Sequence, residues 1–189
     1  EETSKQIEQM HDVGIGGYFM HARGGLQTEY MGEEWFENIG ACIEECNKRG
    51  MHAWAYDENG WPSGFGCGAV NGLGVEYQQK YLRCEETDSP KNTENTIANM
   101  ESNGKNLHFY YDVNPFYVDV MDKKVIAEFL KSTHEKYIDV LGKNLGGMVG
   151  FFTDEPQISR NGIPWSFVYD KEYSRRYGEN INEHLEELF

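Results

Sequence analysis

The stretch MVGFFTDEP, residues 148–156, decides the fold that the sequence predicts. It is a short apolar run that ends in Asp154, Glu155 and Pro156. Gly146 and Gly147 precede it as a turn signal, and Pro156 is expected to restrict Glu155 to extended backbone. An apolar run of this length between turn signals is typical of a parallel strand buried on both faces. Such strands carry functional groups at their carboxyl ends, so the pattern predicts a site at Asp154 and Glu155.

The same alternation of helix and strand runs through the flanking sequence. Helices are expected over residues 3–12, 33–49 and 123–143, and further strands over 17–22 and 51–57. This order predicts parallel βαβ units. A complete (β/α)8 barrel takes about 250 residues, and only three strands are visible here. We therefore expect residues 1–189 to be a segment of a TIM-barrel catalytic domain, with an open doubly wound sheet as the alternative.

The two longer helices show apolar stripes that mark their buried sides. On the helix over 33–49 the stripe consists of Phe36, Ile39, Ile43 and Cys46. On the helix over 123–143 it consists of Val125, Ile126, Phe129, Leu130, Tyr137, Ile138 and Leu141. Both helices are therefore expected to cover the parallel sheet.

Residues 70–120 interrupt the alternation. The runs 77–86 and 107–113 have β character, and Asn103-Gly104 is a typical hairpin turn. The sequence predicts a small β insertion after the second visible strand. Beyond residue 153 we expect an aromatic loop with Pro164 and Trp165, followed by short helices near 170–177 and 180–188.

Composition limits the possible partners. The chain carries 32 acidic residues against 17 Lys and Arg, a formal net charge of −15. This excess of acid argues against nucleic acid and against an anionic membrane surface as partner. No apolar run is long enough to span a bilayer, and EETSKQIEQM is expected to be helical, not a signal peptide. Four scattered cysteines indicate reduced thiols, so a cytoplasmic location is favoured, although an export signal would lie outside this segment.

The ends of the expected parallel strands carry polar side chains that should meet at one rim. The first strand ends at His21 and Arg23, and the second at Asp57, Glu58 and the nearby Trp61. Acids at two neighbouring strand ends favour general acid–base chemistry, because like charges push one pKa upward. Trp61 and Trp165 would offer flat faces for sugar rings. The plainer interpretation is that these acids pair with Arg23 and cap helices.

Other motifs are weak. The glycines at 64, 66, 68 and 72 do not have dinucleotide-binding spacing. The six histidines include no H-E-x-x-H, and no C-x-x-C occurs, which disfavours a structural zinc ion. The run Asp57-Glu58-Asn59-Gly60 lacks the acid spacing of a calcium loop, so no metal site is assigned.

Two segments resemble a known family. Residues 14–68, from GIGGYFMHARGG to YDENGWPSGFGCG, together with GFFTDEP at 150–156, resemble the catalytic barrel of bacterial glycoside hydrolases similar to α-L-rhamnosidases. YDENGWPSG is the more specific motif. The resemblance implies that the visible strands are strands two to four and that an oligosaccharide of plant or microbial origin is the substrate.

The resemblance also implies roles for individual residues. Glu155 would be the general acid, and His21, Arg23, Asp57, Glu58, Trp61, Asp154 and Trp165 would contact the substrate. Related barrels commonly have Asn where this chain has Asp154. The second catalytic carboxylate would come from the remainder of the same barrel, outside this segment. A calcium ion near the sugar is implied as well.

These observations leave three hypotheses of function. The first is a glycoside hydrolase that is catalytically incomplete as this segment alone. The second is a non-catalytic carbohydrate-binding barrel that kept the cleft but lost the pair of carboxylates. The third is another barrel enzyme, such as a metal-dependent hydrolase, because this fold hosts many chemistries.

Overall fold

The computed structural model describes residues 2–189 as two compact units. The first unit comprises the described residues up to Val70 together with Ala127–Pro156, and the second comprises Asn71–Ile126 with Gln157–Phe189. The predicted β insertion at 70–120 lies in the second unit, which also includes the last part of the chain. Each unit has its own sheet and its own core.

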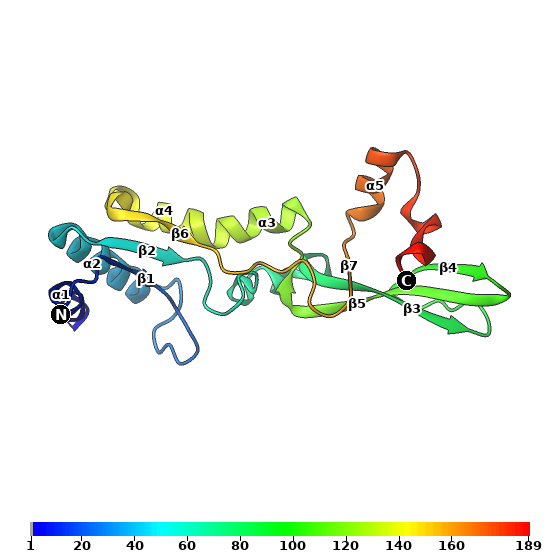
Figure 1. The fold of residues 1–189 in the computed structure, drawn as a ribbon, viewed down its shortest axis with the longest axis horizontal. Coiled ribbons are helices and arrows are strands. Elements are labelled where there is room, and N and C mark those ends of the chain that lie inside the picture. The colour runs from blue at the N-terminus through cyan, green and yellow to red at the C-terminus, as the bar shows by residue number, and fades with distance from the viewer. Residues whose placement is uncertain (1) are drawn as a thin grey trace. The chain divides into compact units, whose positions relative to one another are not determined.

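A parallel three-stranded sheet forms the centre of the first unit, in the order β1-β2-β6 (Figure 1). Its strands are β1 (Gly17–Met20), β2 (His52–Tyr56) and β6 (Met148–Phe152). The three strands and their parallel direction confirm the sequence-based prediction. The pairing of Tyr56 with Phe152 at the end of the ladder places the two acidic strand ends next to each other.

Helices cover one face of this sheet. They are α1 (Glu2–Asp12), α2 (Glu33–Arg49) and α4 (Lys136–Leu141), with the π-helix η4 (Lys131–Glu135) and the 3-10 helix η5 (Gly142–Gly147) next to α4. The predicted stripe of α2 is buried and packs against Met20, Ala53 and Ala55. Gly50 ends α2 in the left-handed conformation that favours glycine.

Two residues of the predicted stripe near 123–143 are exposed, Leu130 and Ile138. The helix is interrupted by η4, where the backbone forms a wider turn. The buried positions Phe129, Thr133 and Tyr137 instead recur at every fourth residue. An α-helix would rotate such positions off one face by about 40° at each step, and the wider turn corrects this drift.

The opposite face of the parallel sheet is aromatic. Phe19 and Phe152 lie with their ring centroids 5.0 Å apart, and Phe152 lies 5.8 Å from Tyr56. Trp54 adds a further ring, 6.1 Å from Phe19. Phe19 and Phe152 are 52% and 40% exposed, so this face of the sheet is partly open to solvent in the described chain.

An antiparallel four-stranded sheet in the order β4-β5-β3-β7 builds the second unit. Its strands are β3 (Gln78–Thr87), β4 (Thr96–Ser102), β5 (Lys105–Val118) and β7 (Ile163–Trp165). Asn103 and Gly104, both with positive φ, form the turn between β4 and β5, which confirms the predicted hairpin. The polar strand β4 and the short strand β7 were not predicted.

Helical segments complete the second unit. They are α5 (Tyr169–Tyr177) and the 3-10 helices η2 (Asn71–Leu73), η3 (Val75–Tyr77), η6 (Ile181–Glu183) and η7 (Leu185–Leu188). The 3-10 helix η1 (Gly66–Gly68) belongs to the first unit, and α3 (Lys123–Leu130) begins in the second unit and ends in the first. The predicted helix at 180–188 is therefore two 3-10 segments. The core of this unit consists of Leu82, Phe109, Trp165, Ile181 and Leu185.

The prediction of a partial (β/α)8 barrel is wrong. The described chain is a small α/β domain with one parallel three-stranded and one antiparallel four-stranded sheet. The physical reason lies in β7, the strand that comes after β6. Instead of extending the parallel series, β7 pairs antiparallel with β3, and the parallel series stops at three strands.

Candidate functional site

The carboxyl edge of the parallel sheet gathers most of the polar residues that the sequence singled out. His21 follows β1, Asp57 follows β2, and Asp154 follows β6 with Thr153 between. The Asp57 N–H donates to the Phe152 carbonyl oxygen at 3.3 Å, which extends the ladder by one step beyond the strands. The strand ends are therefore fixed relative to one another by the sheet itself.

Asp57 is fully engaged inside the protein. It is 1% exposed, and its two carboxylate oxygens accept hydrogen bonds from Ser63 Oγ and Thr153 Oγ1, each at 2.6 Å. A buried carboxylate is tolerated only with such partners. Asp57 thus holds the end of β6 and the following loop onto β2, and no free oxygen is left at the surface for a sugar.

Ser63 connects the two acidic strand ends. Its hydroxyl accepts the N–H of Asp154 at 2.9 Å while donating to Asp57, and its own N–H donates to the Asp154 carbonyl oxygen at 2.9 Å. Both backbone polar groups of Asp154 are therefore held by Ser63. The backbone immediately before Glu155 is fixed as a result.

Glu58 supports the glycine-rich loop from inside. It is 1% exposed, and its carboxylate accepts the N–H groups of Asn59, Gly64, Gly66 and Cys67 at 2.9, 3.3, 2.7 and 3.2 Å. Burial raises the pKa of Glu58, and these four hydrogen bonds partly oppose the rise. The geometry gives Glu58 a structural role in place of the predicted contact with substrate.

The loop that wraps Glu58 requires its glycines. Gly64 and Gly66 have φ of 131° and 58°, and Gly68 has φ of 80°. Side chains rarely adopt such backbone, which is why this segment is rich in glycine. The spacing of these glycines does not fit a nucleotide site. Instead, they allow the loop to fold around the buried carboxylate of Glu58.

His21 and Tyr56 form a stacked pair at the same edge. Their ring centroids lie 3.5 Å apart with an interplanar angle of 25°. Burial, and then the charge of Arg23, lower the pKa of His21, which favours the neutral ring. Tyr56 donates its hydroxyl to Asp154 Oδ2 at 3.1 Å, and burial with this bond raises its pKa to about 12.

Two buried polar atoms at this edge have no hydrogen-bond partner among the described residues, Nε2 of His21 and the hydroxyl of Tyr30. Burial raises the pKa of Tyr30, with smaller contributions from the nearby Tyr137 and Glu58. Unpaired buried polar atoms are rare and costly. Both atoms are shielded from solvent, so each is an unmet hydrogen-bonding group inside this edge.

Glu155, Arg23 and Trp61 are the exposed members of the predicted set. Glu155 is exposed and has φ of 47°, so the prediction of extended backbone at this residue is wrong. Pro156 favours extended backbone at Glu155, but the two hydrogen bonds between Ser63 and the backbone of Asp154 hold the chain in a different path. Trp61 is 42% exposed, and Asp154 is half-buried.

Trp165 lies in the second unit and is 5% exposed. Its ring packs edge-on against Tyr169 at 5.4 Å, within the core that also includes Leu82 and Phe109. The flat face that the sugar-stacking prediction required is covered. Trp165 anchors β7 in its sheet.

Sequence reasoning missed four residues of this edge: Tyr30, Tyr56, Ser63 and Thr153. Tyr56 and Thr153 immediately adjoin predicted residues, so adjacency to a strand-end acid was an available signal. Ser63 lies in the W-P-S-G motif, where its hydroxyl could have been suspected. Nothing in the sequence marks Tyr30, which comes from the segment between β1 and α2.

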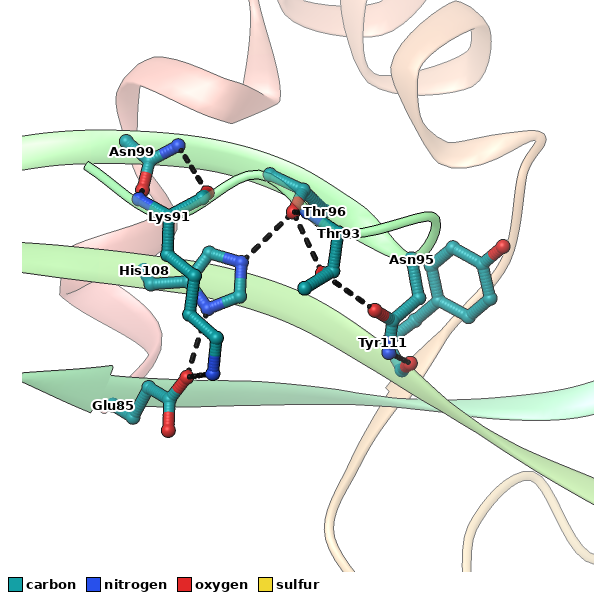
Figure 2. A network of polar contacts seen from close by, with 8 residues as sticks. All are labelled: Glu85, Lys91, Thr93, Asn95, Thr96, Asn99, His108 and Tyr111. Atoms are coloured by element: carbon teal, nitrogen blue, oxygen red, sulfur yellow. Dashed lines mark hydrogen bonds and ion pairs between the residues drawn. The ribbon is translucent and has the colours of Figure 1, made fainter. Parts of the chain in front are cut away.

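A second polar cluster lies on the antiparallel sheet (Figure 2). His108, which is buried, contacts Glu85 Oε1 through Nδ1 at 3.0 Å and Thr96 Oγ1 through Nε2 at 2.9 Å. The order hydroxyl, imidazole, carboxylate matches that of nucleophilic hydrolases. However, the Thr96 hydroxyl also accepts the N–H of Thr93 at 2.8 Å and lies 2.9 Å from its hydroxyl.

This cluster therefore fastens a loop. Lys91 pairs with Glu85 at 2.8 Å, and its backbone N–H and carbonyl oxygen both bond the side chain of Asn99. Figure 2 shows the contacts joining β3, β4 and β5 to the connecting segment. The geometry supports a structural role for His108.

Among residues 2–189 no group of three or more His, Cys, Asp or Glu side chains is arranged to hold a metal ion. The calcium ion that the resemblance implies does not fit Asp57 or Glu58, because hydroxyl and N–H donors already occupy their oxygens. The same described residues contain no helix with the length and apolar character needed to cross a bilayer.

Comparisons with known proteins leave the family open. No protein-family model matches the chain, and neither the curated proteins nor the solved structures include a significant match.

Proposed function

We propose that the carboxyl edge of the parallel sheet binds a carbohydrate and that the protein is a glycoside hydrolase with Glu155 as the general acid. One observation carries this proposal. Of the four acids at the ends of β2 and β6, only Glu155 is exposed, and the backbone before it is fixed by both hydrogen bonds of Ser63. A catalytic acid needs this combination of access and fixed position.

The surrounding groups suit a neutral polyol. Asp154, which is half-buried, retains acceptor capacity beyond the bond from Tyr56, and the exposed Arg23 supplies donors. Trp61, which is partly exposed, offers a face for a sugar ring. The resemblance of the YDENGWPSG segment to glycoside hydrolases supports the same substrate class.

In this role Glu155 protonates the glycosidic oxygen as the bond to the anomeric carbon breaks, and the proton passes from the carboxyl group to the leaving alcohol. Hydrolysis also requires a second carboxyl group as nucleophile or base. Asp57 and Glu58 do not supply it, because both are buried and hydrogen-bonded. No step is assigned to a metal ion.

The burial of Asp57 and Glu58 also favours a second candidate function, a carbohydrate-binding domain without catalysis. Such a domain needs the polar edge and the exposed Trp61 but no second carboxylate. It differs from the first candidate only in the outcome of turnover measurements.

The test compares Glu155→Gln with wild type in the full-length protein on a panel of aryl glycosides. For substrates with poor leaving groups we expect turnover to fall on the order of 100-fold or more. With a dinitrophenolate leaving group, which departs without protonation, the loss should nearly vanish. Glu94→Gln, an exposed acid of the second unit, is the matched control and should leave turnover unchanged.

Equal losses for all leaving groups would remove Glu155 from the role of acid. Oligosaccharide binding without turnover in the wild-type protein would favour the binding domain. Absence of both binding and turnover across the panel would overturn both candidates.

A further inference from the structure

A cavity of about 800 Å³ lies entirely within the second unit. It is open to solvent on one side and is lined by the start of α3, the segment before α5, α5 itself and η6. Its volume falls in the range of small-molecule sites, roughly 300–1,000 Å³. Neither the proposed sugar site nor any motif found in the sequence uses these residues.

The wall of this cavity is positively charged in a protein that is strongly acidic. Four cationic residues line it, Lys123, Lys171, Arg175 and Arg176, against two acids, Asp122 and Glu172, so cations outnumber acids two to one. The whole chain carries −15. Cations gathered at one cavity of an acidic protein attract an anionic ligand to that place.

The two acids offset only part of this charge, because four cations face two carboxylates. Glu172 accepts from Arg175 Nη2 and Nε at 2.7 and 3.1 Å through one oxygen. The pKa of Glu172 is lowered first by this bond and the charge of Arg175, and further by Lys123 and Arg176. Glu172 therefore neutralises Arg175, which leaves Lys123, Lys171 and Arg176 against Asp122. Asp122 uses one oxygen to cap α3, accepting the N–H of Lys124 at 2.8 Å.

The rest of the wall is apolar and aromatic. Tyr169, Tyr173 and Tyr177 follow one another at four-residue spacing along α5 and line the cavity. The rings of Tyr173 and Tyr177 lie 4.8 Å apart at an angle of 47°. Tyr169 donates its hydroxyl to Met121 Sδ at 2.9 Å, so this hydroxyl is already engaged with another residue that lines the cavity. Rings in this arrangement favour a planar apolar body.

We propose that this cavity binds a small aromatic anion, a planar ring that carries a phosphate, sulfate or carboxylate group. The ring lies against the tyrosines of α5, and the anionic group pairs with Lys123 and Arg176. These two cations come from different helices, so one ligand group bridges α3 and α5. The inference is independent of the proposed sugar site.

The competing explanation is an ordinary solvated helix surface with one ion pair. It accounts for the bond between Arg175 and Glu172, which is an i, i+3 pair. It does not account for Lys123, which acts on the same carboxylate from another helix, or for three tyrosines lining the same space.

The test measures binding of phenyl phosphate to the 189-residue protein by calorimetry. Benzyl alcohol serves as the neutral ring, and inorganic phosphate as the anion without a ring. We expect phenyl phosphate to bind most tightly and its affinity to fall with added NaCl. The double variant Lys123→Gln/Arg176→Gln should weaken binding roughly tenfold, at about 1.4 kcal/mol for each factor of ten.

Two further variants separate the contributions. Tyr177→Ala, at an exposed position, should weaken phenyl phosphate without changing inorganic phosphate. Lys48→Gln, a cation of the first unit that is paired with Glu44, should change nothing. Equal binding of benzyl alcohol, equal binding of inorganic phosphate, or an unchanged affinity in the double variant would each overturn the proposal.

Discussion

The same dipeptide, Asp-Glu, follows two neighbouring strands of the parallel sheet, but its side chains are buried after one strand and more exposed after the other. At the end of β2, Asp57 and Glu58 are each 1% exposed and fully hydrogen-bonded. At the end of β6, Asp154 is half-buried and Glu155 is exposed. The acids, the strand direction and the sheet are the same, so none of these features decides which acid is available for chemistry.

The difference lies in the residues that come after each dipeptide. After Glu58 the chain enters a glycine-rich loop whose N–H groups turn back toward the carboxylate. After Glu155 comes Pro156, which has no N–H to donate. An acid at a strand end therefore becomes structural when the next loop supplies enough donors to replace water, and remains available when it does not.

The largest expected effect is a difference in the free energy of unfolding between variants of Glu58 and Glu155. Glu58→Ala leaves four N–H groups without an acceptor, and we expect the free energy of unfolding to fall by about 3–5 kcal/mol. Glu155→Ala should change it by less than about 1 kcal/mol, because the side chain is exposed. Urea denaturation followed by circular dichroism measures both. Similar losses in the two variants would break the comparison.

The next effect concerns the hydroxyls that hold Asp57. Removing one should cost about 1–3 kcal/mol, because a buried carboxylate oxygen loses its donor. Ser63→Ala should cost more than Thr153→Ala, since Ser63 also accepts the N–H of Asp154. Thermal unfolding of both variants and of Thr93→Ala in the second unit ranks them. A larger loss for Thr153→Ala would show that Ser63 does not join the two strand ends.

A smaller effect is expected from the backbone of Glu155. Its φ of 47° lies in the left-handed region, which costs a residue with a side chain about 1–2 kcal/mol. Glu155→Gly should therefore be more stable than Glu155→Ala by about 1 kcal/mol. Chemical denaturation of the two variants gives the difference directly. A less stable glycine variant would mean that residue 155 does not adopt this conformation in solution.

The smallest expected effect is a pH dependence from Glu58, because its hydrogen bonds partly offset the effect of burial. Its pKa is raised in the folded state above the ordinary value of 4.5. The folded protein then holds the proton more tightly than the unfolded chain, so the contribution is present below that value and is lost as pH rises through the raised pKa.

Unfolding free energies between pH 4 and pH 8 measure this dependence in wild type and in Glu58→Gln. Stability of wild type should decline with rising pH relative to the variant, while all other groups titrate equally in both. If wild type instead gains stability relative to Glu58→Gln as pH rises, the four N–H bonds outweigh burial in setting the pKa of Glu58.

Much of the local structure could be predicted from the sequence. The helix at 33–49, the three parallel strands and the Asn103-Gly104 hairpin follow from periodicity and turn chemistry, which act over a few residues. The gathering of His21, Asp57 and Asp154 at one edge follows from the parallel direction of the strands. The fold class could not be predicted, because β7 has three residues and is defined only by its pairing with β3.

The sequence alone determined which residues can lie at the carboxyl edge of the sheet. The apolar runs mark the strands, and the acids follow directly after these runs. Only the tertiary structure decided that Glu58 is buried, that Trp165 lies in the core of the second unit and that Glu155 is exposed. The physical reason is that burial depends on partners distant in the chain, and no local pattern records where their donors and side chains will lie.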